Sequence, residues 1–274
     1  MNIQTNNRIQ EVLDHEPKRW WIYTLVAVII AALSYWSLST INFQGINDIG
    51  VTIARNIFQA LIEPNQEWLF TFESFGIPYL MFETVAIAFL GTIIGAVFAI
   101  PFAFFSSRNI AGPFGSFLGS TLVAAIRTFP VFILGLMFIK VTGPGPFAGV
   151  LTIGLSSIGM ITKLYVEVIE DIDKGVLEAL DAAGCNTLQK IQYGIIPQLS
   201  ANFISTAIYR FEINVRNATV LGLVGAGGIG FTLIAAMGAY RWRDAAAALW
   251  GIIIVVLVIE YASTKLRKKL TSAE

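Results

Sequence analysis

Charged residues are scarce in this chain of 274 residues. Asp, Glu, Lys and Arg make up 13% of it, whereas a soluble domain carries about 25%. So few charges cannot cover a surface that faces water, and the composition therefore argues against a soluble protein. The formal net charge is zero, which gives no indication of nucleic-acid binding.

Cysteine and histidine are almost absent, because Cys185 and His15 are the single residues of their types. One cysteine excludes an internal disulfide and a cysteine-based metal site. One histidine, His15 in the N-terminal tail, leaves no second imidazole to share a metal, and catalysis by a Ser/His or Cys/His pair is disfavoured. The sequence also lacks G-x-x-x-x-G-K-S/T, the phosphate loop of ATPases. We therefore expect no metal, no cofactor and no enzymatic activity in the isolated chain.

Long apolar runs take the place of these residues, since 55% of the chain is hydrophobic and the mean hydropathy is +0.70. About 20 apolar residues cross a bilayer as a helix. We identify six such stretches, roughly at 20–41, 79–104, 116–140, 147–168, 199–222 and 245–265. The first run is too long for a signal peptide and lacks a cleavage site, so it is expected to stay as an anchor. The sequence predicts an all-α membrane protein with one domain over 1–274.

The distribution of Lys and Arg predicts the orientation of these spans. With the N-terminus inside, the inner segments carry Arg8, Lys18, Arg19, Arg108, Lys163, Lys174, Lys190, Lys265, Arg267, Lys268 and Lys269. The outer segments carry only Arg55, Lys140, Arg241 and Arg243. Both termini are therefore expected inside, with residues 1–19 as a cytoplasmic tail and 169–198 as a cytoplasmic segment.

The longest outer segment, residues 42–78, contains a helical pattern of apolar residues. Its members are Ile46, Ile49, Ile53, Ile57 and Leu61, at spacings of three and four. This pattern predicts a short amphipathic helix on the outer face, which Pro64 ends.

The segment 169–198 is predicted to form two short helices. The first carries an apolar stripe of Leu177, Leu180, Ala183 and Leu188, and Gly184 permits a turn of positive φ at its end. Asn186 and Thr187 suit the start of the second helix. That helix is expected to run through Gln189–Ile195 until Pro197 stops it.

Residues 178–197, EALDAAGCNTLQKIQYGIIP, resemble the EAA loop of ABC-importer permeases. The matching positions are Glu178, Ala179, Gly184 and Pro197, whereas Leu180, Gly194 and Ile196 depart from the family pattern. The resemblance implies that this loop docks on a separate ATPase, with Glu178, Ala179, Leu180, Gly184 and Pro197 as the coupling residues.

Residues 225–230, GAGGIG, match the G-x-G-x-x-G pattern of dinucleotide-binding proteins. That function needs a strand–helix–strand unit of about 30 residues, and this stretch lies between two predicted spans. A glycine-rich bend of Gly225, Gly227, Gly228 and Gly230, which lets backbones pack closely, is the preferred interpretation. An oxidoreductase remains an alternative that predicts nicotinamide binding.

Three longer stretches look like phosphonate-type ABC permeases: 145–154 (GPFAGVLTIG), 162–198, and 209–230 (YRFEINVRNATVLGLVGAGGIG). The resemblance implies a type I importer permease in the bacterial cytoplasmic (inner) membrane. It also implies two copies of the chain, two ATP-binding subunits that carry ATP and Mg, and an extracytoplasmic substrate-binding protein. Phosphite or another small solute is an alternative substrate. An ion-coupled secondary transporter is a different class, for which changes at Glu178 or Gly184 would have no effect.

Several polar residues lie inside the predicted spans, where a charge costs about 2.5–3.5 kcal/mol. They are Arg127, Arg210, Glu212, Arg216, Asn217 and Thr219. Glu212 and Arg216 are four residues apart, so they can pair on a helix. The arginines suit the lining of an anion path, because their planar fork matches phosphonate oxygens. A structural ion-pair network with Glu83, Glu167 or Glu212 is the alternative, and the sequence leaves both open.

Overall fold

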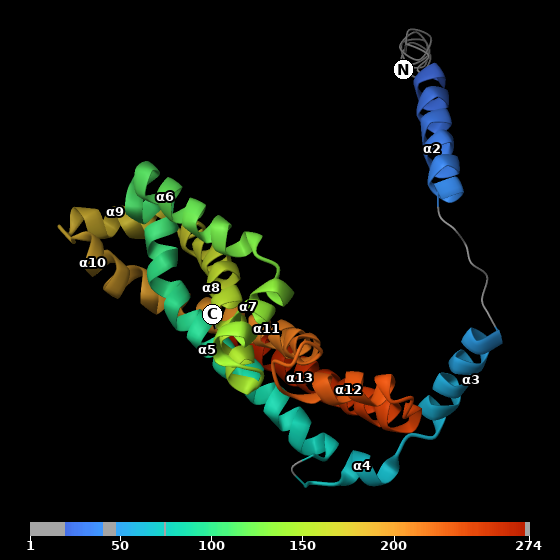
Figure 1. The fold of residues 1–274 in the computed structure, drawn as a ribbon. Helices are drawn as coiled ribbons and strands as arrows, with labels where there is room; N and C mark the ends of the chain where they lie inside the picture. Colours follow the sequence, from blue (N-terminus) through green and yellow to red (C-terminus); the bar gives the residue numbers. More distant parts are fainter. Residues whose placement is uncertain (1–19, 41–47, 74, 272–274) are drawn as a thin grey trace, which may run out of the picture. The chain divides into compact units, whose positions relative to one another are not determined.

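The computed structural model describes residues 20–40, 48–73 and 75–271. The predicted tail at 1–19 and the first part of the predicted outer loop, 42–47, lie outside these residues. The described residues form helices and no strand, which confirms the all-α prediction (Figure 1). They divide into two units, one up to Thr52 and one from Ile53 onward.

The first unit contains the apolar helix α2 (Trp20–Thr40) and the start of α3 (Asp48–Ile62). Helix α2 has 21 residues and a mean hydropathy of 1.8. At about 1.5 Å per residue it is as long as the hydrocarbon core of a bilayer is thick. This helix matches the first predicted span.

The part of α3 from Ile53 onward belongs to the second unit and is amphipathic. Ile53, Ile57 and Leu61 are half-buried and Ala60 is buried, while the residues between them are exposed. The helix ends before Pro64, as the sequence predicts. Its position on the membrane surface stays a prediction.

The other helices of the second unit follow one another with short connections (Figure 1). In chain order they are α4 (Gln66–Phe70), α5 (Ile77–Ser106), α6 (Arg108–Thr128), α7 (Val131–Thr142), α8 (Pro146–Glu170), α9 (Lys174–Ala182), α10 (Thr187–Lys190), the π-helical turn η1 (Ile191–Ile195), α11 (Ile196–Gly222), α12 (Ile229–Gly238) and α13 (Trp242–Thr271). Helix α11 therefore leads from the α9–α10 loop at one end of the unit to α12 at the other.

Glycines bring α5 and α8 close together in the centre of the second unit. A Cβ atom added to Gly91 would lie 2.7 Å from Cβ of Ile153, and one added to Gly95 would collide with Ser157. Gly91 and Gly95 form a GxxxG pair, a spacing that permits close approach of two membrane helices. Because dispersion forces act at short range, this close contact stabilises the pair of helices.

A buried polar cluster ties α11 to the pair α5 and α8. The Asn214 side-chain amide donates hydrogen bonds to Oγ1 of Thr92 (2.9 Å) and to Oγ of Ser157 (2.8 Å). All three side chains are buried. Each bond satisfies a polar group that would be costly to bury alone, so these three helices are joined in one packed core.

The predicted third span, 116–140, is wrong as a single helix. Helix α6 ends at Thr128 and α7 begins at Val131, with Phe129 in an extended conformation between them (φ −76°, ψ 120°). Pro130 explains the break, because proline has no N–H to donate and forces the preceding residue out of the helical region. The hydrophobic run is continuous in the sequence, but the backbone is not continuously helical.

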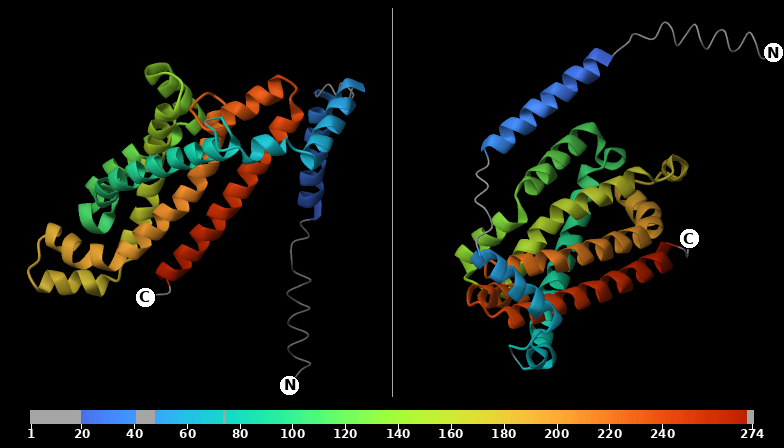
Figure 2. Two further views of the ribbon diagram at one scale, coloured as in Figure 1. Left: turned by 90° about the horizontal axis from the view of Figure 1, so that it is seen from below. Right: turned by 90° about the vertical axis from the view of Figure 1, so that its right-hand side faces the viewer.

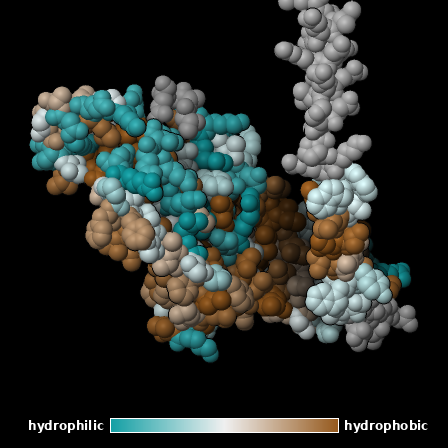
Figure 3. Space-filling model, turned by 90° about the horizontal axis from the view of Figure 1, so that it is seen from above, coloured by the Kyte–Doolittle hydropathy of each residue, from teal (hydrophilic) through white to brown (hydrophobic). Residues whose placement is uncertain are grey.

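Five described helices are long and apolar enough to cross a membrane: α2, α5, α6, α8 and most of α13. Helix α11, the predicted span 199–222, has 27 residues and is long enough. It differs from the five in the charges that it carries in its middle. On the face of the molecule in Figure 3, hydrophilic residues gather toward the α9–α10 end, and hydrophobic residues cover much of the surface beyond them.

Candidate functional site

The loop between α8 and α11 is held in shape by local hydrogen bonds. Asp173 caps α9 by accepting the N–H of Gly175 at 2.8 Å. Gly184 makes the turn after α9 with a φ of +76°. Asn186 then begins α10 with a capping box, in which its side chain and that of Gln189 each accept the other residue's backbone N–H. The loop lies at one end of the second unit (Figure 2).

The apolar stripe predicted for this loop is divided between two environments. Leu177 packs against the core cluster around Ile169 and Ile195, and Leu180 is half-buried. Ala183 and Leu188 are exposed, and Leu188 keeps 76% of its surface. The spacing predicts one outward-facing apolar stripe. The structure instead buries one half of it and exposes the other. The first half of the stripe fixes α9 to the molecule, because apolar side chains bury where a neighbour is available.

Leu180 and Gly194 contact each other. A Cβ atom added to Gly194 would collide with Cδ1 of Leu180 and lie 3.8 Å from Cγ1 of Val176. Both residues depart from the EAA loop that this segment resembles, in which an alanine at the first position and an isoleucine at the second are usual. In this chain the large and small residues have changed places, so the two departures compensate in volume. Sequence reasoning treated them as separate and missed the contact.

Pro197 does not end the second helix, which corrects the prediction. Helix α10 continues through the π-helical turn η1 into α11, with Pro197 in the first turn of α11. In the π turn the N–H of Ile196 bonds to the carbonyl oxygen of Ile191, five residues back. This wider turn shifts the hydrogen-bonding register just before the proline. Pro197 therefore lies in the first turn of α11, where backbone N–H groups have no partner within the helix, and its lack of an N–H costs nothing there.

Glu178 and Ala179 are both exposed on α9, beside the tip of the loop. An ion pair between Lys190 and Asp181 joins α10 to α9 across that tip. The five predicted coupling residues therefore fall into two groups. Glu178 and Ala179 are available at the surface, whereas Leu180, Gly184 and Pro197 determine the shape of the loop.

Arg210 lies in the middle of α11 and is only 5% exposed. It makes no hydrogen bond or ion pair with any described residue, and its buried Nε has no partner. A buried charge without a partner is strongly unfavourable. The side chain therefore needs a partner that the described part of the chain does not provide.

Arg216, six residues further along α11, is paired with two carboxylates. Its Nη2 lies 3.1 Å from Oε1 of Glu212 and 3.0 Å from Oε2 of Glu260. Arg267 reaches the other oxygen of Glu212 at 3.6 Å, and its guanidinium lies over the ring of Tyr209. The pair of Glu212 and Arg216 was predicted from its spacing. Glu260 and Arg267 were missed, because a contact with α13 leaves no signal in the spacing of α11.

The other predicted carboxylate partners lie elsewhere. Glu83 accepts a hydrogen bond from the N–H of Gly228, and Glu167 pairs with Lys163. Among the described residues neither forms an ion pair with a membrane arginine, so of the three carboxylates proposed for the network only Glu212 has such a pair.

Among the described residues, the remaining predicted path residues form no hydrogen bond or ion pair with Arg210 or Arg216. Arg127 is exposed at the end of α6, where its Cγ lies 2.8 Å from the position of a Cβ added to Gly159 in the middle of α8. Asn217 is half-buried, and Thr219 donates back to the carbonyl of Val215. No described hydrogen bond or ion pair joins these residues into one site.

The glycine-rich bend between α11 and α12 is clamped on several sides. Gly225, Gly227 and Gly228 have φ values of +94°, +84° and +74°. A Cβ added to Gly230 would lie 2.8 Å from Cα of Gly222. Glu83 accepts the N–H of Gly228 at 2.9 Å, and Thr84 accepts that of Ile229 at 3.0 Å. The N–H groups of Gly228 and Ile229, which could otherwise bind a dinucleotide phosphate, are thus already bound within the chain.

Taken together, the helical architecture and an exposed two-helix loop ahead of a charged membrane helix define a membrane transport subunit. Over residues 91–266 the sequence matches the family of binding-protein-dependent transport system inner membrane components. The chain belongs to this family, whose members are permease subunits and not enzymes. Membership implies an ATP-binding partner and a substrate-binding protein.

Three relatives carry the names of phosphorus oxyanions. The chain is 38% identical to the phosphite transport system permease protein PtxC of Stutzerimonas stutzeri, over 69% of each chain. It is 30% identical to the phosphate-import permease protein PhnE of Mycolicibacterium smegmatis, over 78% of this chain and 40% of that protein. It is 42% identical to the putative cryptic phosphonate transport system permease protein PhnE2 of Escherichia coli, over 43% of this chain and 97% of that protein.

Solved structures of importers share the fold. The inward-facing MetNI methionine ABC transporter matches with a TM-score of 0.60 at 22% identity, over 69% of this chain and 94% of that one. This likeness confirms the type I importer permease fold.

Proposed function

We propose that this chain forms the membrane pathway of an ATP-driven importer for phosphonates or closely related phosphorus oxyanions. The observation that carries the proposal is the buried and unpaired Arg210 in the middle of α11. An anion that passes along α11 would supply the missing negative charge. The guanidinium fork matches two oxygens of a phosphonate or phosphite group.

The names of the relatives support this class of substrate, because phosphite, phosphate and phosphonate are all tetrahedral phosphorus oxyanions. A single arginine recognises the oxygens that these anions share. Phosphite is therefore the second candidate, and competition between the anions orders them.

The α9–α10 loop is proposed to face the cytoplasm and to dock on an ATPase subunit. Glu178, Ala179 and the exposed Leu188 form the surface that would be contacted. Leu180, Gly184 and Pro197 act by shaping that surface. Two such ATPase subunits, which bind ATP and Mg²⁺, would serve two copies of the permease.

A second permease copy is supported by the half-exposed ion pair of Arg216 and Glu260. Their side chains keep 49% and 50% of their surface although both lie on long membrane helices. Charges at membrane depth face protein or water and not lipid. A second copy, packed around a shared two-fold axis, would enclose this face and the anion path.

The experiment is uptake of radiolabelled methylphosphonate by the complete transporter in cells that lack other phosphonate uptake, with phosphite and phosphate as competitors. We expect Arg210→Gln to lower uptake at least about tenfold, since it removes the charge that binds the anion. The same change should leave the melting temperature of the permease–ATPase complex unchanged or higher, because an unpaired buried charge is removed. Uptake at the wild-type rate would contradict the role of Arg210.

Arg216→Gln is the matched control, because it removes the same charge from the same helix. It breaks the contacts with Glu212 and Glu260, so the melting temperature is expected to fall. An ATPase-inactive partner, or Glu178→Arg in the loop, should abolish uptake. Transport that persists in both would instead favour an ion-coupled transporter.

A further inference from the structure

The turn between α12 and α13 holds a tyrosine in a conformation that favours glycine. Tyr240 has a φ of +59° and is the one non-glycine residue with positive φ among the described residues. Its N–H bonds to the carbonyl of Met237, and the N–H of Arg241 bonds to that of Ala236. This is the helix-ending pattern in which glycine normally occupies the left-handed position. A tyrosine is strained there, and such strain is concentrated at functional sites.

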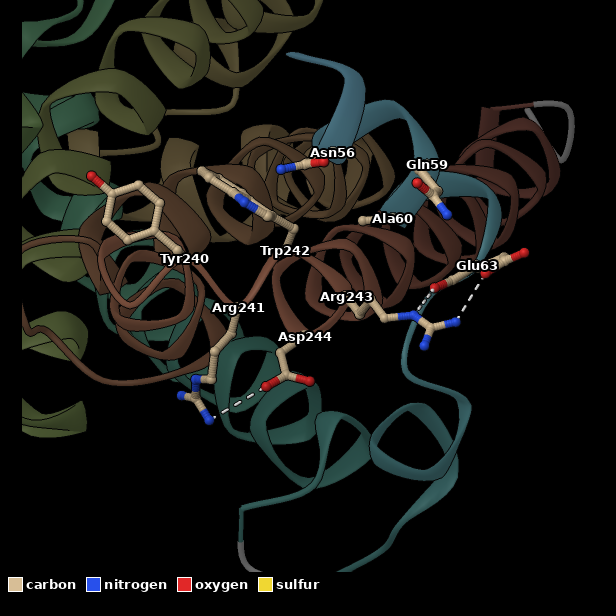
Figure 4. A pocket seen from close by; sticks show the side chains of 9 residues that line it. All are labelled: Asn56, Gln59, Ala60, Glu63, Tyr240, Arg241, Trp242, Arg243 and Asp244. Atoms are coloured by element: carbon tan, nitrogen blue, oxygen red, sulfur yellow. Dashed lines mark hydrogen bonds and ion pairs between the residues drawn. The ribbon is translucent and has the colours of Figure 1, made fainter. Parts of the chain in front are cut away.

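The strained turn forms one wall of a cleft of about 480 Å³ (Figure 4). Asn56 and Gln59 of α3, with Glu63 just after the end of that helix, form the opposite wall. Tyr240 is 68% exposed, and its ring meets that of Trp242 edge to face at 5.7 Å. The sequence at the turn is Tyr-Arg-Trp-Arg, residues 240–243. These three residue types dominate the binding energy of protein–protein interfaces.

The two arginines of this turn are held by exposed ion pairs. Arg241 lies 3.3 Å from Asp244, and Arg243 lies 3.0 Å from Glu63. The arginine side chains keep 59% and 66% of their surface. Pairs this exposed contribute little to stability, so carboxylates of a partner could take over either arginine at small cost.

The backbone beneath the cleft is rigidly supported. The N–H of Asn65 bonds to the carbonyl of Arg243 at 3.1 Å, and its side chain donates to Asp244 at 2.8 Å. The Trp250 indole donates to the carbonyl of Leu61 at 2.9 Å. Residues 245–248, all alanine, are buried behind the turn. A surface that is fixed before binding loses little entropy when a partner docks.

We propose that residues 240–243 and the adjoining cleft form the docking surface for the extracytoplasmic substrate-binding protein of this transporter. The inference rests on the proposed function, because it places the α9–α10 loop on the ATPase side. Helix α11 has 27 residues, about 40 Å, so the turn that follows α12 lies on the opposite side of the membrane. The expected partner surface is a projecting loop or helix with Asp or Glu side chains that reach Arg241 and Arg243.

A protein fits this surface better than a lipid headgroup layer does. Aromatic and arginine residues also occur at membrane interfaces. Here, however, they border a concave cleft lined by the amides of Asn56 and Gln59 and by the carboxylates of Glu63 and Asp244. A carboxylate-lined hollow neither inserts into a bilayer nor attracts anionic lipid.

The test is the ATPase activity of the permease–ATPase complex in nanodiscs, titrated with the purified binding protein loaded with methylphosphonate. Tyr240→Gly relieves the backbone strain and removes the exposed ring. We expect the concentration of binding protein that gives half-maximal stimulation to rise at least about tenfold, as for an interface hot spot. The melting temperature should stay the same or rise. If Tyr240 served only to stabilise the fold, the same change would lower the melting temperature. Arg241→Glu is expected to shift the half-maximal concentration in the same direction.

The outcomes separate the alternatives. Phe72→Gly, which removes another exposed aromatic ring from the α4–α5 connection, is the control and should leave the half-maximal concentration unchanged. An unchanged half-maximal concentration in both Tyr240→Gly and Arg241→Glu would overturn the docking surface alone. A smaller amount of permease in the membrane, with an unchanged half-maximal concentration of binding protein, would mean that the turn contacts the membrane. That result would also overturn the docking surface. A wild-type complex that does not respond to the loaded binding protein would overturn the proposed function, and the docking surface with it.

Discussion

The two ends of α11 are fixed to the rest of the molecule in opposite ways. At the α12 end, backbone packs against backbone, because Gly222 lies against Gly230 and a Cβ on Gly149 would collide with the carbonyl of Ala226. At the α10 end, a side chain fills the space, because Leu180 occupies the volume that Gly194 leaves free. At the first end the glycine positions leave no room for a Cβ atom, whereas at the second end the space is shared between one large and one small residue.

The two ends therefore differ in how they tolerate substitution. At the α12 end the tolerance is set by a single glycine, and at the α10 end it is set by a pair of residues. A glycine with positive φ cannot be replaced without strain, whatever its neighbours are. A packed pair can change if both members change together, since total core volume matters more than the identity of each residue. The bend after α11 should therefore tolerate single changes worse than the coupling loop does.

The largest expected effect is that of Gly228→Ala in the bend. Gly228 has φ +74° and ψ −167°, a region that is essentially restricted to glycine and costs about 1–3 kcal/mol for another residue. The added Cβ would also displace the Thr84 hydroxyl, which accepts the N–H of Ile229. We expect the free energy of unfolding to fall by about 2–4 kcal/mol, measured by thermal and denaturant unfolding of the purified complex.

Gly238→Ala is the matched control in the same helix. No heavy atom lies within 4 Å of a Cβ added there, and Gly238 is helical. Because alanine is a better helix former, this change should be neutral or should stabilise by up to about 1 kcal/mol. Equal melting temperatures for the two variants would contradict the claim that the bend excludes side chains.

The sequence was sufficient for features that repeat along the chain. Long apolar runs indicated α2, α5, α8 and α13, because only a helix satisfies its own backbone inside a bilayer. The spacing of Glu212 and Arg216 was enough to predict their ion pair. The run 116–140 was misleading, because hydropathy is insensitive to the break that Pro130 imposes on the backbone.

Contacts between distant residues could not be predicted. Leu180 and Gly194 lie on different helices, and Arg267 meets Glu212 across more than fifty residues of sequence. Such pairs depend on how helices pack, which no local pattern encodes. The strained Tyr240 was also missed, since its positive φ follows from the tight turn between α12 and α13 and not from a turn residue in the sequence.

An intermediate effect is expected when the coupling-loop pair is changed one residue at a time. Gly194→Ile overfills the space beside Leu180 and should cost about 1–3 kcal/mol. Leu180→Ala leaves a cavity and should cost about 2 kcal/mol, at the low end for a leucine because this side chain is half-buried. The double variant should be more stable than the sum of the two costs implies, with a coupling energy of about 1–3 kcal/mol.

The double-mutant cycle is measured by denaturant unfolding of the complex, with ATP-driven uptake as a second readout. Gln192→Ala, an exposed change in the adjoining π turn, is the control and should change stability by less than about 0.5 kcal/mol. Strictly additive costs for Gly194→Ile and Leu180→Ala would show that the two residues do not share one space.

The smallest expected effect is that of Asn186→Ala at the start of α10. The change removes the acceptor of the Gln189 N–H, a bond of 2.9 Å, and half of the capping box. Losing such a cap costs about 1 kcal/mol. Because α10 is exposed and has four residues, the cost should appear as local opening. Hydrogen exchange of the Gln189 amide should accelerate about fivefold while the melting temperature hardly changes.

Gln192→Ala, an exposed change in the adjoining turn, should leave that exchange rate as it is. A large fall in melting temperature for Asn186→Ala would instead mean that the loop and α11 unfold as one unit, and the two ends of α11 would then be equally rigid.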